Sequence, residues 1–213
     1  MTASWYFDFI SPYSYLQWQR VRAIGVPLAY RPVLFAALLG HHGQKGPVEI
    51  EGKRKFTYRF VQWRADRAGV PLKFPPQHPF NPLAALRLCV AAGCSDAAIE
   101  AIFNHLWREG RRGDTAESLE DVAAALGIED TATAVSAPAV KAALRHNFDT
   151  AIASDVFGVP SIVAEGKVFW GEDATGMFEE FLDNPGLFDT EEMRRLRDLP
   201  AGARRRAVGA TDA

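Results

Sequence analysis

An alternation of large apolar residues near the start of the chain predicts a β-strand. Residues 5–10 read W-Y-F-D-F-I. Because successive side chains of a strand point to opposite faces, Trp5, Phe7 and Phe9 share one face and Asp8 lies on the other. Asp8 is then either a buried carboxylate with hydrogen-bond partners or an acid that tunes a site.

A helix start follows this strand directly. Ser11 stands at the position of an N-cap and Pro12 at the first helical position, and apolar residues then recur at helical spacing. The unpaired N–H groups and the positive end of the helix dipole favour a thiolate, carboxylate or phosphate at such a terminus. Ser11 is therefore a candidate catalytic residue, although the same residue could serve as an N-cap alone.

A second strand and a long loop are predicted after this first helix. Residues 26–35 read V-P-L-A-Y-R-P-V-L-F and predict a second strand that breaks near Pro32. A helix between two strands indicates a parallel crossover. The glycine-rich stretch 40–52 predicts a loop, and its length favours a functional role for Gln44, for Lys45 and for Lys53 at its exit.

Residues 53–126 have mainly helical patterns. The segment 53–68 is expected to bury Phe56, Phe60 and Trp63 on one side, and 81–93 forms the next helix after a proline-rich loop. Ser95 caps a helix whose apolar residues follow the i, i+3, i+4 pattern closely. These residues are Ile99, Ile102, Phe103, Leu106 and Trp107.

The period changes again towards the end of the chain. Ser118 with Asp121 resembles a capping box, and residues 138–155 predict a long helix. Two short strands, 159–164 and 167–170, are joined by Glu165-Gly166 and predict an antiparallel hairpin. A last helix, 173–182, is expected to turn three apolar side chains inward. They are Met177, Phe178 and Phe181.

This order of elements predicts an α/β protein in which a helical insertion interrupts a strand-containing domain. The boundaries that follow are 1–38 with 151–185 for the α/β domain and 39–150 for the helical insertion. The small and basic segment 200–213 is predicted to be a disordered tail.

Composition narrows the function classes. The chain has 213 residues, of which 48% are hydrophobic, and a net charge of −2 with mixed signs. No global attraction to nucleic acid or to a membrane surface follows from that charge. No segment resembles a signal peptide or a membrane span, so a cytoplasmic protein is expected.

Cysteine and histidine give no metal or disulfide pattern. Cys89 and Cys94 are five residues apart in a helical segment, a spacing that places them on different faces and predicts buried, inert thiols. His41 and His42 are adjacent and the other histidines are scattered, so we expect no metal site.

The order of elements resembles the thioredoxin fold in its DsbA-like form. Disulfide oxidoreductases of that fold have C-x-x-C at the helix start, where this chain has S-P-Y-S at 11–14, so dithiol chemistry is not expected there. The segments F-D-F-I-S-P-Y-S-Y, V-F-G-V-P-S-I-V and F-W-G-E-D are similar to the family of 2-hydroxychromene-2-carboxylate isomerase and kappa-class glutathione transferase. The similarity extends to about Leu182.

This resemblance implies glutathione as cofactor and a small aromatic substrate as partner. It implies that the Ser11 hydroxyl donates to the glutathione sulfur, and that the Val159 backbone, before a cis Pro160, pairs with the cysteinyl part. It further implies a set of glutathione-binding positions, some of which depart from the family. These are Asp173 for the γ-glutamyl amine, Lys53, Gln44 in place of asparagine, and Glu172 in place of a small polar residue.

Each assignment has a structural alternative. Asp173 could be a first-turn acid of the last helix, and Lys53 could belong to a solvated run of basic residues. Aromatic residues could form a substrate pocket between the two domains, although Trp107 could equally be core. The candidates are Tyr13, Phe35, Phe80 and Trp107.

Three functions are compatible with these residues. The first is a glutathione-dependent isomerase of aromatic degradation products, and the second is a kappa-like transferase that conjugates glutathione to electrophiles. The third is a glutathione-binding thioredoxin-fold module without turnover. Proteins of this architecture are often dimers, so a homodimer is an expectation of the resemblance alone.

Overall fold

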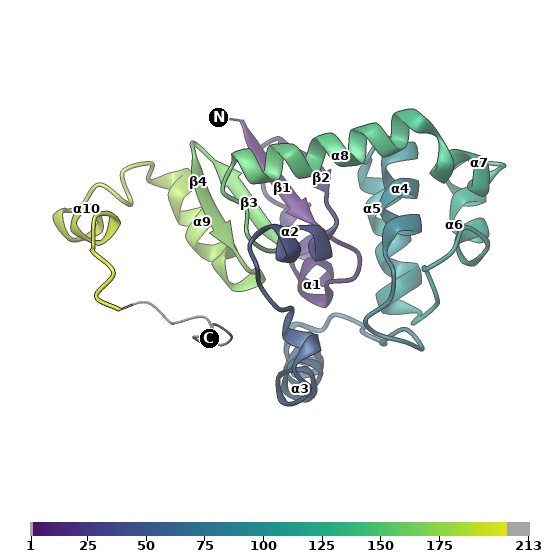
Figure 1. Cartoon of the computed structure of the whole chain (residues 1–213), viewed down its shortest axis with the longest axis horizontal. Helices are drawn as coiled ribbons and strands as arrows, with labels where there is room; N and C mark the ends of the chain where they lie inside the picture. Colours follow the sequence, from purple (N-terminus) through teal and green to yellow (C-terminus); the bar gives the residue numbers. More distant parts are fainter. Residues whose placement is uncertain (1, 204–213) are drawn as a thin grey trace, which may run out of the picture. The chain divides into compact units, whose positions relative to one another are not determined.

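A four-stranded sheet forms the centre of the computed structural model, which describes residues 2–203 (Figure 1). The strand order is β2-β1-β3-β4, with β2 parallel to β1 and β3 antiparallel to both of its neighbours. The predicted parallel crossover and antiparallel hairpin are confirmed. The strands are β1 (Ala3–Phe7), β2 (Leu28–Pro32), β3 (Ser161–Ala164) and β4 (Lys167–Trp170).

Helices fill most of the chain between β2 and β3, which confirms the predicted α/β fold with a large helical insertion. The helical segments are α1 (Pro12–Val21), α2 (Phe35–His41), η1 (Pro47–Glu49), α3 (Glu51–Ala68), α4 (Leu83–Ala91), α5 (Asp96–Phe103), the π-helical turn η2 (Asn104–Arg108), η3 (Glu117–Leu119), α6 (Glu120–Ala125), α7 (Thr131–Ser136), α8 (Pro138–Ala153), η4 (Glu172–Ala174), α9 (Thr175–Asp183) and α10 (Glu191–Arg197).

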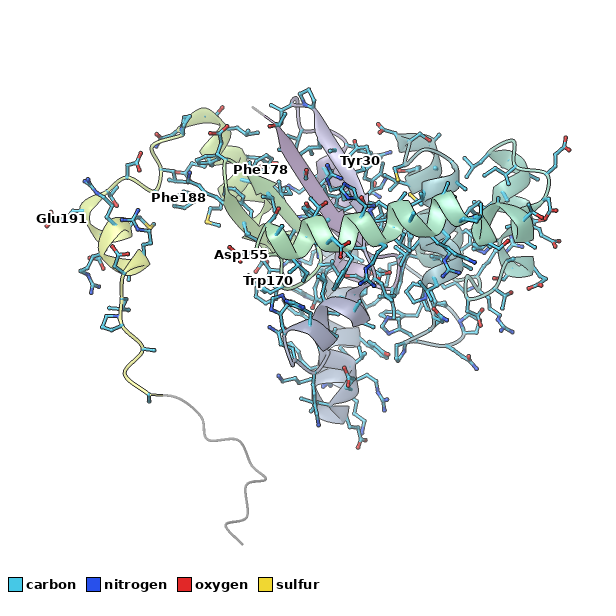
Figure 2. All side chains as sticks on the ribbon, turned by 45° about the horizontal axis from the view of Figure 1, so that its top comes forward. Tyr30, Asp155, Trp170, Phe178, Phe188 and Glu191 are labelled. Carbon is cyan, nitrogen blue, oxygen red and sulfur yellow. The ribbon has the colours of Figure 1, made fainter. Side chains whose placement is uncertain are left out.

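The chain divides into two compact units, Met1–Gly176 and Met177–Ala213. In the second unit the rings of Phe181 and Phe188 stack with centroids 5.8 Å apart, and α10 is a helix that the sequence pattern did not predict (Figure 2). The predicted domain boundaries at 38/39 and 150/151 stay predictions. Residues 204–213 of the predicted disordered tail lie outside the described residues.

One face of the sheet carries an aromatic core. Trp5 stacks on Phe7 with ring centroids 4.2 Å apart and on Trp18 of α1 at 5.5 Å. Phe103 of α5 packs on Phe9 at 4.7 Å. The predicted sharing of one strand face by Trp5 and Phe7 is therefore confirmed, although β1 begins at Ala3 and ends at Phe7, before the predicted Phe9.

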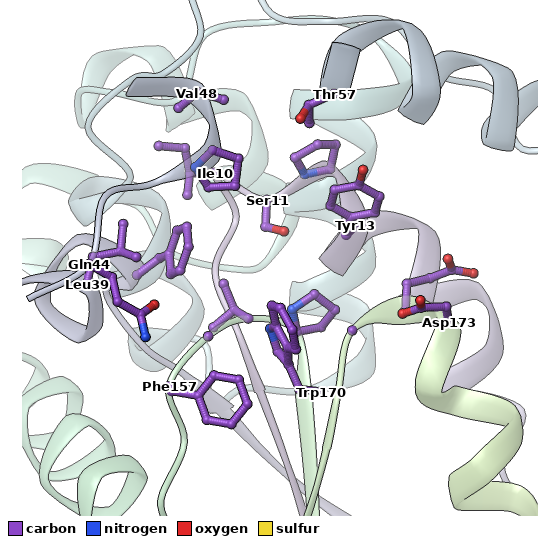
Figure 3. Close-up of a pocket in the computed structure, with 18 of the residues that line it drawn as sticks. Ile10, Ser11, Tyr13, Leu39, Gln44, Val48, Thr57, Phe157, Trp170 and Asp173 are labelled. Carbon is purple, nitrogen blue, oxygen red and sulfur yellow. The ribbon is translucent and has the colours of Figure 1, made fainter. Parts of the chain in front are cut away.

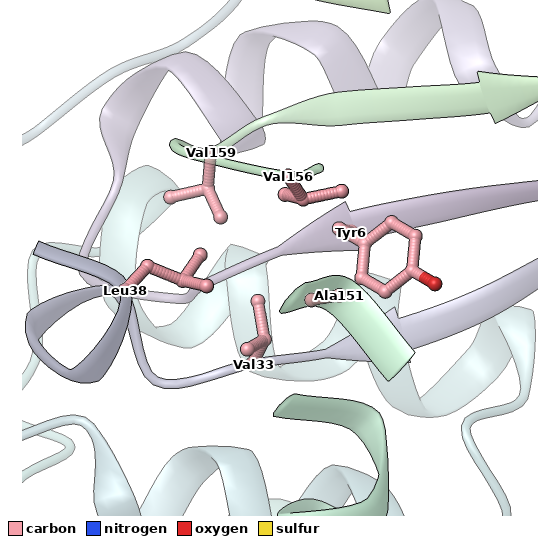
Figure 4. Packing of buried hydrophobic residues seen from close by; sticks show 6 residues of the cluster. All are labelled: Tyr6, Val33, Leu38, Ala151, Val156 and Val159. Carbon is pink, nitrogen blue, oxygen red and sulfur yellow. The ribbon is translucent and has the colours of Figure 1, made fainter. Parts of the chain in front are cut away.

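The opposite face of the sheet packs against aliphatic side chains (Figure 4). Tyr6 points to this face and is 1% exposed. Because both faces of β1 are covered, its residues are buried on either side of the alternation. The cluster consists of Tyr6, Val33, Leu38, Ala151, Val156 and Val159.

Predictions of which side chains are buried were wrong in two helices. Phe56 and Trp63 on α3 are 60% and 55% exposed, and α3 buries Val61 and Ala65 instead. Met177 was expected to point inward and is 40% exposed. Apolar spacing identified a helix in both places but did not identify which face meets the rest of the protein.

The predicted capping box at Ser118 was also wrong. The Ser118 hydroxyl accepts from the Thr115 N–H and donates to the Thr115 carbonyl, so it closes a local turn before the helix begins. The Asp121 carboxylate pairs with Arg111 at 2.8 Å. Ser118 and Asp121 therefore have the spacing of a capping box but bind other groups.

The two cysteines lie together rather than on different faces. Helix α4 ends at Ala91, and the chain turns back so that the Cys94 N–H donates to the Cys89 carbonyl at 2.9 Å. Cys89 is buried and its thiol donates to the Cys94 sulfur, which lowers the pKa of Cys94, whereas burial raises the pKa of Cys89. Both cysteines are free.

A buried amide connects the sheet, α1 and the turn after β4. Gln17 on α1 accepts from the Trp5 indole N–H at 2.6 Å. Its amide N–H groups donate to the Gly171 carbonyl at 3.1 Å and to the Thr175 hydroxyl at 3.0 Å. Gln17 is fully buried, so the Trp5 indole N–H depends on it for a partner, whereas the Thr175 hydroxyl also donates to the Glu172 carbonyl.

We expect Gln17→Ala to lower the free energy of unfolding by roughly 2 to 4 kcal/mol, because it leaves buried donors and acceptors unpaired. Urea unfolding at constant pH measures the change. Gln19→Ala, on the same helix with only an exposed bond to Arg22, is the control and should stay within about 0.5 kcal/mol of wild type. Equal destabilisation by both substitutions would contradict this role of Gln17.

Candidate active site

A cavity of about 480 Å³ lies at the N-terminal end of α1 (Figure 3). That volume is typical of a small-molecule site. Its walls come from the β1–α1 turn, α2 and the loop after it, α3, and the segments on either side of the β3–β4 hairpin. The site residues predicted from the sequence that line this cavity are Ser11, Tyr13, Phe35, Gln44, Val159, Pro160, Glu172 and Asp173.

Ser11 is the N-cap of α1 and faces this cavity. Its hydroxyl oxygen accepts from the Ser14 N–H at 3.2 Å, and its backbone conformation is extended, as a cap requires. A hydroxyl has one donor and two acceptor positions, so accepting this bond leaves its proton available. The residue can therefore cap the helix and donate to a ligand at the same time.

Val159 and Pro160 line the cavity from the segment that enters β3. The Val159–Pro160 peptide bond is cis, as predicted. The Pro160 carbonyl accepts from the Gly171 N–H at 2.9 Å, which ties this segment to the end of β4. A Cβ on Gly158 would lie 2.6 Å from the Trp170 indole nitrogen, so glycine is required for Trp170 to cover this segment.

Asp173 and Gln44 lie on opposite sides of Ser11 in Figure 3. Asp173 follows Gly171, whose φ of +97° is a conformation that favours glycine. A Cβ on Gly171 would lie 2.4 Å from the Asp173 carboxylate, so the close approach also excludes a side chain there. The site thus has an amide at one end, a carboxylate at the other and a hydroxyl between them.

Three predicted site residues do not line the cavity. Lys53 is exposed in the first turn of α3, and the lysine that lines the cavity is Lys45. Trp107 is fully buried, where its indole N–H donates to the Phe9 carbonyl at 2.8 Å. Phe80 lines a separate small hollow. The role in glutathione binding implied for Lys53 stays a prediction.

Opposite charges meet at one wall of the cavity. The Arg64 guanidinium on α3 lies 2.5 Å from the Glu172 carboxylate. Burial raises the pKa of Tyr13, and nearby Arg64 partly opposes this effect while Asp173 and Glu172 add to it. The carboxylate that sequence comparison placed beside Asp173 is therefore compensated by a cation that sequence reasoning missed.

Asp8 is buried and hydrogen-bonded, which confirms the structural alternative for this residue. Its carboxylate accepts from the Ile10 N–H at 3.0 Å and from the Phe35 N–H at 2.8 Å. The Asp8 carbonyl accepts from the Ser11 N–H at 3.0 Å. Burial raises the pKa of Asp8 to about 7, and these backbone N–H groups oppose the rise.

His78 supports the same turn from the loop after α3, and sequence reasoning missed it. The His78 Nε2–H donates to the Ile10 carbonyl at 2.8 Å, because a carbonyl can only accept. The Tyr58 hydroxyl lies 2.8 Å from Nδ1 and 2.7 Å from the His78 carbonyl. Burial lowers the pKa of His78, so the ring favours the neutral form.

Within residues 2–203, no helix is long and apolar enough to cross a membrane. The same part of the chain has no cluster of three or more His, Cys, Asp or Glu side chains that could hold a metal ion.

Comparison with known proteins first assigns the class. Residues 2–183 match the family described as DSBA-like thioredoxin domain. The cytosolic disulfide reductase DsbM from Pseudomonas aeruginosa, in a structure with GSH, shares this fold with a TM-score of 0.58 and 17% identity, over 86% of this chain and 100% of that one. The active-site C-x-x-C expected of a disulfide oxidoreductase is replaced in this chain by residues 11–14.

The more specific relationship is to an isomerase. This chain is 30% identical over 189 residues to 2-hydroxychromene-2-carboxylate isomerase of Pseudomonas putida, over 84% of this chain and 93% of the relative. A solved structure of 2-hydroxychromene-2-carboxylate isomerase is 25% identical and covers 92% of this chain and 98% of its own, with a TM-score of 0.75. The chain belongs to this isomerase family within the DSBA-like thioredoxin class, and these relatives support an isomerase function.

Asp8 predicts a distinct dependence of stability on pH. Its pKa is about 7 in the folded protein and near the ordinary 3.8 in the unfolded chain, so the folded state binds more protons between these values. The free energy of unfolding therefore falls as pH rises from about 4 to about 7, by at most about 1.4 kcal/mol per pH unit from this group. Asp8→Asn removes this contribution.

Urea unfolding of both proteins between pH 4.5 and 7.5 tests this expectation. The difference between wild type and Asp8→Asn cancels the titration of other groups, including His78, whose lowered pKa acts in the opposite direction at the acidic end. We expect wild type to lose stability relative to the variant as pH rises. Parallel curves across the range would show that Asp8 does not titrate in this window.

Proposed function

We propose that this protein is a glutathione-dependent cis–trans isomerase of aromatic acids of the 2-hydroxychromene-2-carboxylate type. The observation that carries the proposal is the Ser11 hydroxyl, which faces the cavity at the start of α1 while it accepts the cap bond from Ser14. The names of the relatives support the reaction class and the substrate type.

The residues present fit glutathione. Gln44 and Asp173 lie on opposite sides of Ser11 (Figure 3), and Val159 lines the same cavity. An amide can bind a carboxylate or peptide group, and the Asp173 carboxylate can accept from an amine. The DsbM structure with GSH indicates that a protein of this fold accommodates the tripeptide.

When bound, glutathione would supply a thiol nucleophile that is regenerated when the isomerised product leaves. A free thiol titrates near ~8.5, so nucleophilic attack at neutral pH requires stabilisation of the thiolate. Ser11 supplies a hydrogen-bond donor and the start of α1 supplies a positive potential. A hydrogen bond to a charged group contributes roughly 1.5 to 3 kcal/mol, which corresponds to a pKa lower by one to two units.

The other residues of the cavity orient the substrate and limit access of water. Phe35, Phe60, Phe157 and Trp170 supply apolar and aromatic surface. Such surface favours an aromatic ring and lowers the local dielectric, which strengthens the interaction of Ser11 with a negative charge.

Ser11→Ala should lower the turnover of 2-hydroxychromene-2-carboxylate with catalytic glutathione by about 10- to 100-fold, because the donor to the thiolate is lost. The pH at which half-maximal rate is reached should rise by one to two units. Rates are measured by rapid mixing and optical detection of the two isomers across pH 5.5 to 9.5.

Ser14→Ala is the matched control for this test. The Ser14 hydroxyl is buried in the same helical turn, has no hydrogen-bond partner among the described residues and does not line the cavity. Its removal should leave the rate and pH profile close to wild type. An unchanged rate in Ser11→Ala would refute the central role of Ser11, and consumption of one glutathione per substrate would identify a transferase instead.

Asp173→Asn should weaken glutathione binding roughly three- to tenfold, because a neutral amide loses the charge interaction with the γ-glutamyl amine. Isothermal titration calorimetry without substrate measures this effect. Glu165→Gln, at the exposed turn of the β3–β4 hairpin, removes a carboxylate outside the cavity and should bind as wild type does. If both variants bind equally well, the end assigned to the amine is wrong.

A further inference from the structure

Helix α3 presents one polar-and-aromatic face to the cavity. Thr57, Phe60 and Arg64 line the cavity, and their spacing of three and four residues places them on one side of the helix. Figure 3 shows Thr57 near Tyr13 on this side of the cavity. Arg64 is therefore held in the wall by the helix backbone rather than by a loop.

The guanidinium of Arg64 is only partly used by the protein. Its Nη2 lies 2.5 Å from the Glu172 Oε2, an ion pair that uses one of its nitrogens. The Arg64 Cζ lies 5.8 Å above the Phe60 ring. A guanidinium has five N–H donors, so within residues 2–203 these contacts leave most of the Arg64 donors available to a ligand.

Burial and charge around Arg64 favour an anionic ligand. The Arg64 side chain is 30% exposed and the Glu172 side chain is 11% exposed, so the carboxylate is the more enclosed partner. Glu172 pairs with one side of the guanidinium, which leaves the other donors for a ligand in the cavity. A planar guanidinium matches the two oxygens of a carboxylate better than an ammonium does.

We propose that Arg64 is the carboxylate-binding residue of this cavity, and that the Glu172 carboxylate competes with the ligand for its guanidinium. The bound group is a carboxylate of the aromatic acid or the γ-glutamyl carboxylate of glutathione. The choice between these two sources rests on the proposed function, whereas binding of a carboxylate by Arg64 does not. The aromatic face of Phe60 beside the cation favours an aryl carboxylate.

Two pairs of probes test the proposal without turnover. The first pair is trans-cinnamate and trans-cinnamamide, which differ in the carboxylate. The second is glutathione and 4-aminobutyryl-cysteinylglycine, which lacks the γ-glutamyl carboxylate. Binding is measured by calorimetry, with the cinnamate pair also titrated in the presence of saturating glutathione.

Arg64→Gln should weaken binding of the member of one pair that carries the tested carboxylate at least tenfold, and it should leave the member that lacks this carboxylate within twofold. Loss confined to cinnamate assigns the aromatic acid, and loss confined to glutathione assigns the tripeptide. Arg67→Gln is the control. Arg67 lies about one turn further along α3 with its guanidinium over the exposed Trp63, so its replacement should leave all four affinities unchanged. If Arg64→Gln spares both carboxylates, the proposal is wrong.

Glu172 supplies a second and opposite test. Glu172→Gln removes the competing charge and should strengthen binding of the same carboxylate about three- to tenfold, with no gain in an Arg64→Gln background. The double variant also avoids an unpaired Glu172 carboxylate, so a folding defect in Arg64→Gln does not decide the result. Weaker carboxylate binding in Glu172→Gln would show that the Glu172 charge does not compete with the ligand for Arg64. Failure of isomerase turnover with these affinities intact would refute the proposed function alone.

Discussion

The hydrogen bonds of the Asp8 carboxylate are the constraint on which the site depends. They join the residue before Ser11 to the first residue of α2, so one buried group fixes the helix start and the Phe35 wall together. His78 holds the same turn through the Ile10 carbonyl. Burying a carboxylate is unfavourable unless such N–H groups compensate it, and burial raises the pKa of Asp8 although these groups oppose the rise.

The remaining walls depend on contacts between distant parts of the chain. Gln17 on α1 holds the Gly171 carbonyl, and the Gly171 N–H holds the Pro160 carbonyl. Through these bonds α1, which begins after Ser11, is connected to the cis proline before β3 and to the turn that carries Asp173. Ser11 and Ser14 take the positions that cysteines have in the disulfide oxidoreductases of this fold, so the start of α1 holds hydroxyl groups rather than thiols.

Local patterns predicted the fold and the centre of the site. Ser11 and Pro12 carry a helix-start signal, and Glu165-Gly166 carries a hairpin signal, because both motifs act over a few residues. The burial of α3 was predicted wrongly because Phe56 and Trp63 have helical spacing but face away from the sheet. Arg64 could not be recognised, since its partner Glu172 is far along the chain and no local pattern connects them.

The shallow anchoring of α3 has a consequence for motion. Its 18 residues bury only Val61 and Ala65, whereas α1 buries most of its side chains against the aromatic core. Regions with few buried apolar contacts open at a lower free energy than the core, and they exchange their amide hydrogens sooner. The wall that carries Thr57, Phe60 and Arg64 is therefore expected to open at a lower free energy than the start of α1, so a ligand too large for the cavity at rest would enter by displacing α3 while Ser11 stays in place.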